Sequence, residues 1–149
     1  MRRAGARHLG VPAASLALWL LSCAHSPRPF AGDDLVETRL FFGMSRITGD
    51  PVRDERARQE WEERWQTFLD EVVTPLYPDG LTVLPAIGQW RPRHDGEAAT
   101  MRQYSRVLLL LHDGGADHDR RIRAIIDRYK QQFDQESVLR VESRARVAF

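Results

Sequence analysis

Two apolar runs in the chain have the length and composition of buried β-strands. The first is Thr38–Met44, which is rich in β-forming residues and has a continuous apolar middle. The second is Gln103–His112, which contains Val107–Leu111, the most apolar run after the N-terminal leader. Because an unbroken apolar strand is typical of burial on both faces, these two segments are predicted to be the central strands of a sheet.

Two longer stretches repeat their apolar residues with helical spacing. Arg53–Val73 is predicted to be a helix that ends near Thr74, because Pro75 disfavours the α conformation in the residue before it. A second helix is predicted to run to Phe133, with Asp117 or Asp119 as its N-cap. The apolar stripe of this second helix consists of Ile122, Ile125, Ile126, Tyr129 and Phe133.

The remaining strands have the features of sheet edges. Leu81–Trp90 contains Pro85, which cannot donate a backbone hydrogen bond and therefore favours an edge strand. Ser137–Phe149 alternates apolar and polar residues. The order β-α-β-β-α-β predicts an α+β fold, a ferredoxin-like sandwich with an antiparallel sheet and two helices on one face.

The N-terminus has the pattern of a lipoprotein export signal. Three arginines precede the apolar stretch Leu9–Leu21, which is too short to span a bilayer comfortably, and Leu20-Leu21-Ser22-Cys23 fits a lipobox. The predicted organisation is a signal peptide at 1–22, a flexible tether at 23–36 and one domain at 37–149. Cys23, the only cysteine, is predicted to carry the lipid that anchors the protein to the membrane; the alternative is a free thiol beside an uncleaved anchor.

The predicted location is the cell envelope. Ala24 rather than Asp follows the cysteine, which favours the periplasmic side of the outer membrane in a Gram-negative host. The whole chain has 22 basic and 21 acidic residues, and residues 1–22 contain three of the arginines. The mature chain would therefore have 19 basic and 21 acidic residues, a net charge of −2, which argues against nucleic acid as a partner.

Several segments resemble one family of small bacterial proteins. The segments, in chain order, are Glu37–Gly43, Trp65–Pro75, Pro78–Val83, Gly88–Trp90 and Tyr129–Arg140. Together they are similar to DUF3574, a family of unknown function whose members often carry a lipoprotein-type leader. The stretch Arg53–Glu63 is longer than is usual in that family. The resemblance implies no activity and supplies no catalytic residues.

Three short segments contain residue types that bind ligands or catalyse reactions. His112–Asp119 holds two His and three Asp, which are metal-ligand types, but a glycine turn followed by an acidic helix N-terminus explains them more simply. Gly88–Trp90 offers Gln89 and Trp90 for a planar ligand, or a cover for the core edge. Gln135–Ser137 has no nearby histidine and is interpreted as a connection. We therefore predict no metal, no cofactor and no catalytic residue.

The helix-free face of the sheet is the remaining candidate site. The outward set of the last strand is predicted to be Arg140, Glu142, Arg144 and Arg146. The candidate ligand face consists of Arg39, Gln89, Trp90, Tyr104, His112 and Arg140. Because the apolar run Val107–Leu111 of the third strand would place apolar side chains on both faces of the sheet, we expect this face to be covered by a second subunit, in a homodimer, or by a ligand.

Two functions agree with these features. The first is an exported, non-catalytic binding or interaction module of the cell envelope. The alternative is a small dimeric enzyme of the ferredoxin-like kind that acts on a hydrophobic or aromatic small molecule, for which Arg39, Trp90, Tyr104 and His112 would be the residues to test.

Overall fold

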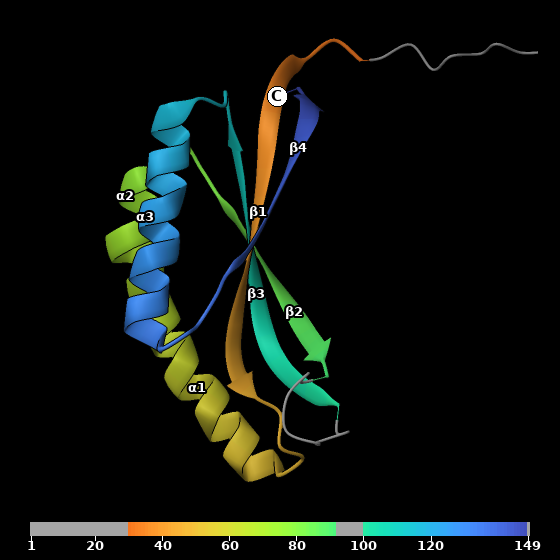
Figure 1. Ribbon diagram of the computed structural model, residues 1–149, viewed down its shortest axis with the longest axis vertical. Helices are drawn as coiled ribbons and strands as arrows, with labels where there is room; N and C mark the ends of the chain where they lie inside the picture. Colours follow the sequence, from red (N-terminus) through yellow and green to blue (C-terminus); the bar gives the residue numbers. More distant parts are fainter. Residues whose placement is uncertain (1–29, 92–99, 149) are drawn as a thin grey trace, which may run out of the picture. The chain divides into compact units, whose positions relative to one another are not determined.

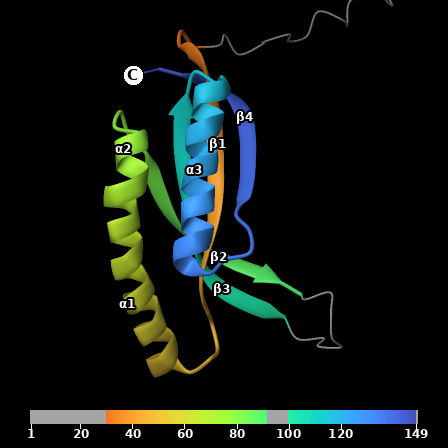
Figure 2. The same cartoon turned by 60° about the vertical axis from the view of Figure 1, so that its left-hand side comes forward.

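The computed structural model describes residues 30–91 and 100–148, and Ala31–Phe149 form one compact unit. The elements in chain order are β1 (Asp33–Arg46), α1 (Pro51–Phe68), a π-helical turn η1 (Leu69–Val73), α2 (Thr74–Leu76), β2 (Thr82–Trp90), β3 (Met101–His112), α3 (Ala116–Phe133) and β4 (Leu139–Val147). The sheet is antiparallel with the order β2-β3-β1-β4. Figures 1 and 2 show the helices on one face of this sheet. The predicted ferredoxin-like α+β fold is confirmed, with β1 and β3 central.

Helix α1 begins two residues before the predicted Arg53 because local side chains cap it. Asp50 is the N-cap, and its carboxylate accepts hydrogen bonds from the backbone N–H groups of Val52 and Arg53. The buried Asp54 carboxylate accepts from the hydroxyl and the backbone N–H of Thr48. These hydrogen bonds lower the pKa of Asp54, and the hydrogen bond from the Thr48 hydroxyl has the largest effect.

The same helix continues past Pro75 to Leu76, so the predicted end near Thr74 is wrong by two residues. The reason is η1, in which the N–H of Thr74 donates a hydrogen bond to the carbonyl of Leu69, five residues earlier. A wider turn directly before a proline gives room for a ring that would otherwise clash with the carbonyl four residues back. The continuation through α2 brings Tyr77 to the sheet, where it is buried.

The core is an aromatic cluster between the sheet and the two long helices. Phe42 from β1 lies at its centre, with ring centroids 5.1 Å from Trp65 of α1 and 4.5 Å from Tyr129 of α3. The hydroxyl of Tyr129 donates a hydrogen bond to the Gly43 carbonyl. Burial raises the pKa of Tyr129, which therefore stays neutral and holds α3 to the central strand.

Two other predictions need correction. Strand β1 begins at Asp33, so the last part of the predicted tether is strand, because it pairs with the end of β4. The N-cap of α3 is Gly115, not Asp117 or Asp119; Gly114 and Gly115 both have positive φ (83° and 100°), which glycine adopts without strain. The predicted signal peptide at 1–22 and Cys23 lie outside the described residues, as do residues 92–99 and Phe149. None of the described helices is long and apolar enough to cross a membrane.

The orientation of β4 is also opposite to the prediction. Arg140 pairs with Leu40 and Glu142 with Thr38, both of which are fully buried under the helices. Since neighbouring residues in register share a face, Arg140, Glu142, Arg144 and Arg146 lie on the helix side. The apolar set of β4 therefore faces away from the helices. Which set of β4 side chains faces the helices is determined by the register between β4 and β1. The alternation of apolar and polar residues within β4 does not determine it.

Candidate functional site

A histidine with both ring nitrogens engaged stands at the end of β3. His112 is 7% exposed, and its Nδ1 accepts a hydrogen bond of 3.1 Å from the Gly114 backbone N–H. Its Nε2 lies 2.9 Å from the hydroxyl oxygen of Thr38 on β1. Because Nδ1 is an acceptor, the proton of the neutral ring is on Nε2, which donates to Thr38. The pKa of His112 is lowered mainly by burial and, to a smaller extent, by the nearby His118, which favours the neutral ring.

Thr38 connects His112 to a chain of charged side chains on β4 and α3. The Thr38 hydroxyl donates to Glu142 Oε1 at 3.1 Å, and Arg140 donates to the same carboxylate. Arg140 also binds Asp119 of α3 at 2.7 Å. The Arg140 hydrogen bonds lower the pKa of both Glu142 and Asp119. The result is a continuous hydrogen-bonded path from the imidazole to the first turn of α3.

A second histidine stacks on the first. His118 belongs to the first turn of α3, and its ring lies 4.7 Å from that of His112 with an interplanar angle of 17°. Its Nε2 is 2.9 Å from Asp113 Oδ1. Its Nδ1 is buried and has no hydrogen-bond partner among the described residues. A carboxylate on one nitrogen fixes the orientation of the ring and leaves the other nitrogen as an acceptor.

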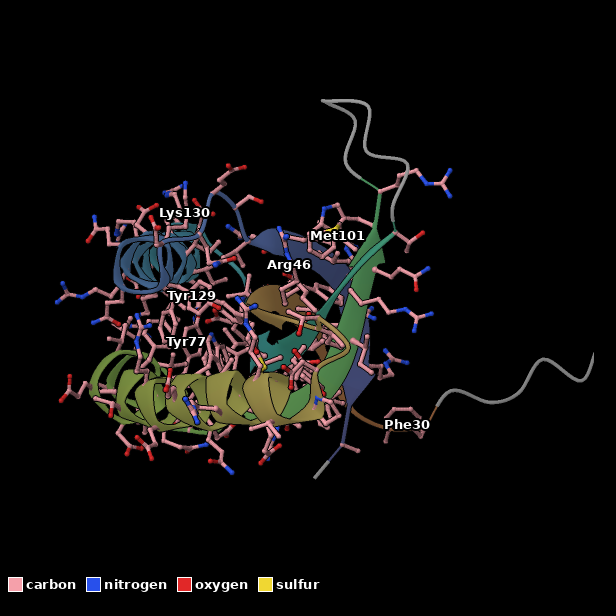
Figure 3. The ribbon with its side chains drawn as sticks, turned by 90° about the horizontal axis from the view of Figure 1, so that it is seen from below. Phe30, Arg46, Tyr77, Met101, Tyr129 and Lys130 are labelled. Carbon is pink, nitrogen blue, oxygen red and sulfur yellow. The ribbon has the colours of Figure 1, made fainter. Side chains whose placement is uncertain are left out.

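Tyr77 completes the cluster from the segment that follows α2. It is 6% exposed, and its ring centroid lies 5.9 Å from that of His118 and 6.5 Å from that of His112. Figure 3 shows Tyr77 in the layer between the helices and the sheet. Its hydroxyl has no partner among residues 30–91 and 100–148. Burial raises the pKa of Tyr77, so the hydroxyl stays protonated and can donate.

These side chains line a pocket of about 240 Å³, here called the histidine pocket. Its lining residues are Leu76, Tyr77, Pro78, Asp79, Gly80, Leu111, His112, Asp113, His118 and Arg121. Arg121 is held 2.6 Å from Asp117 and leaves further N–H groups for a ligand. Over the described residues, no three His, Cys, Asp or Glu side chains assemble into a group suited to a metal ion. The pocket instead offers hydrogen-bonding groups for a small molecule.

The predicted ligand residues divide between the two faces of the sheet. His112 and Arg140 belong to the path described above. Tyr104 also lies on the helix side, where it packs against the core. Gln89 lies farther along β2 on that side and accepts a hydrogen bond from Arg102. Arg39 and Trp90 lie on the opposite face, so these six residues do not form one face.

Sequence reasoning missed the residues that accompany His112. His118 is inside the segment His112–Asp119 that the sequence singled out, but Thr38 and Tyr77 carried no signal. Both reach the site through contacts between distant segments, Thr38 through strand register and Tyr77 through the continuation of the helix past Pro75. The segment Gln135–Ser137 is a connection, in which the Gln135 side chain donates to the Phe133 carbonyl.

Comparisons with known proteins identify a family but no activity. The family model DUF3574, described as a protein of unknown function, matches residues 37–149. A search of curated proteins found no match. Among solved structures, the chain is similar to a phage SAM lyase in complex with S-methyl-5'-thioadenosine, with 16% identity, a TM-score of 0.46, and coverage of 79% of this chain and 87% of that one. The chain belongs to the DUF3574 family.

Proposed function

We propose that this protein is a lipid-anchored binding module of the cell envelope that holds a small polar molecule in the histidine pocket. The proposal is supported mainly by two buried polar atoms, the Tyr77 hydroxyl and His118 Nδ1. Both belong to residues that line the pocket, and neither has a hydrogen-bond partner among the described residues. A buried polar group without a partner costs about 1–3 kcal/mol. A ligand that bonds to both groups would recover that free energy.

The chemistry of the pocket limits the ligand. Tyr77 donates and His118 Nδ1 accepts, so the ligand carries both a hydrogen-bond acceptor and a donor. Arg121 favours a carboxylate at the rim. The volume of about 240 Å³ equals that of roughly eight waters at about 30 Å³ each. A small hydroxy acid fits these limits.

The test uses glycolate as the probe, with acetate and glycerol as partial mimics. Imidazole NMR signals of His112 and His118 are expected to shift saturably with glycolate and less with either mimic. Tyr77→Phe should weaken binding at least tenfold, whereas the matched control Tyr104→Phe, outside the pocket lining, should not change it. Tyr77→Phe should also leave stability unchanged or raise it. A loss above about 1 kcal/mol would show that the hydroxyl has a structural partner, which contradicts the proposal.

The second candidate function is enzymatic, and the pair Asp113–His118 favours it. Asp113 orients the ring so that Nδ1 is free to act as a general base on a bound hydroxyl or acid. His118→Gln removes this base while keeping a polar side chain. Turnover of a small hydroxy acid that disappears in this variant, with binding retained, would favour the enzyme. No turnover in either protein, with binding weakened in His118→Gln, would favour the binding module.

The lipid anchor has its own test. Cys23 follows a basic and apolar leader and is the only thiol in the chain, which supports acylation there. Metabolic labelling with an alkyne fatty acid should mark the wild-type protein and not Cys23→Ser. Fractionation of a Gram-negative host should then place the labelled protein in the outer membrane. Labelling that persists in Cys23→Ser would contradict the assignment.

A further inference from the structure

The sheet face opposite the helices, here called the open face, is mainly apolar. Its apolar side chains come from β1 (Leu35, Phe41), β3 (Val107, Leu109, Leu111) and β4 (Leu139, Val141, Ala145, Val147). Leu139 is 60% exposed and Val141 36% exposed. Figure 1 shows that the helices all lie on the other side of the sheet. Exposed apolar side chains gathered on one face are typical of an interaction site.

The charges at the centre of this face specify the occupant. Glu37 and Arg39 lie two residues apart on β1, so they share the open face, and Arg39 Nε is 2.7 Å from Glu37 Oε1. Their neighbours in register are apolar or uncharged: Leu109 and Val141 flank Arg39, and Leu111 and Ser143 flank Glu37. One acid and one base inside an apolar surface form a pattern that is complementary to itself under a two-fold rotation.

We propose that the open face binds a second copy of this chain, about a two-fold axis that crosses β1 at the level of Thr38. With that axis parallel to the sheet and perpendicular to the strands, β1, β3 and β4 each stack on their own counterpart in the opposite direction. Glu37 then faces Arg39 of the second copy, and Phe41 faces Leu35 of the second copy. Leu35 borders a hollow of about 300 Å³ that Leu109, Leu111 and Thr82 also line. The dimer would cover this hollow.

The overlap between the two copies is centred on β1. About an axis at Thr38, residues 33–43 of β1, 108–112 of β3 and 139–145 of β4 face their own counterparts, whereas β2 begins level with Arg39 and extends away from the axis. At about 3.3 Å per residue along a strand and about 4.8 Å between strands, these residues give a flat area of roughly 360 Å² per copy. Interfaces below about 600 Å² per partner are typical of weak association, so we expect a weak dimer. Sheets stacked in this way pack about 10 Å apart.

The test measures the oligomeric state of the full chain by sedimentation equilibrium in a density-matched detergent. The wild type is expected to show a reversible monomer–dimer equilibrium. Val141→Glu should raise the dissociation constant at least 100-fold, because it places a charge in the apolar overlap. The matched control is Ile87→Glu, which introduces the same charge at a 66%-exposed residue on the helix side of β2. If Val141→Glu fails to fold, Leu139→Glu replaces it.

Charge exchange tests the axis. Glu37→Arg or Arg39→Glu alone should weaken the dimer at least tenfold, because like charges then face each other. The double variant Glu37→Arg/Arg39→Glu restores opposite charges and should return the dissociation constant to within threefold of the wild type. A monomeric wild type, including one that binds lipid vesicles through this face, would overturn the proposal. So would equal weakening by Val141→Glu and Ile87→Glu, or a double variant as weak as the single ones.

Discussion

Replacing Thr38 by Val removes one buried hydroxyl and almost no volume. The hydroxyl accepts from His112 Nε2 and donates to Glu142. His112 is buried and would lose its acceptor, whereas Glu142 is exposed and keeps Arg140. An unsatisfied buried donor costs about 1–3 kcal/mol, so we expect a loss of about 2 kcal/mol. For a domain of this size that corresponds to a fall in Tm of roughly 8 °C.

Urea unfolding followed by tryptophan fluorescence measures this loss, because Trp61 and Trp65 are buried in the core. Thr67→Val is the control, since Thr67 is exposed on α1 and should change stability by less than about 0.5 kcal/mol. In a His112→Leu background, Thr38→Val should cost much less, because the donor is gone. The same cost in both backgrounds, or no cost in the wild type, would refute the hydrogen-bonded path.

Three further predictions concern pH, packing and capping. Burial lowers the pKa of His112 in the folded protein, so on acidification the imidazole is protonated first in the unfolded chain. The free energy of unfolding should therefore fall as the pH decreases from about 6.5 towards the pKa of the folded state. In urea titrations, His112→Gln should reduce this dependence on pH. Phe42→Ala should cost about 3–5 kcal/mol in the same assay, and a loss below about 1 kcal/mol would contradict the central place of Phe42 in the core. Asp50→Ala should cost about 1 kcal/mol by removing the N-cap of α1, with Asp50→Asn restoring most of it.

The sequence predicted the fold because each element had a local signal that agreed with the whole. The apolar runs around Phe41 and Leu109 do form the two central strands, and Pro85 does lie on an edge strand. The helix end near Thr74 was wrong because η1 is a backbone adjustment that residue preferences do not reveal. Strand β1 extends to Asp33 because β4 offers it partners, which is a tertiary effect.

The site was predictable only in part, because it depends on register. His112 and Arg140 were predicted from the sequence, and they do lie on one face of the sheet. Thr38, which connects them, could be identified only from the strand register, in which it pairs with Leu110 of β3 and Glu142 of β4. A shift of one residue in β1 would replace Thr38 by Glu37 or Arg39 on the helix side. Such a shift would bury a charged pair in the core and expose Leu40 and Phe42. The packing of Phe42 therefore holds Thr38 beside His112, so the core that stabilises the fold also fixes the geometry of the pocket.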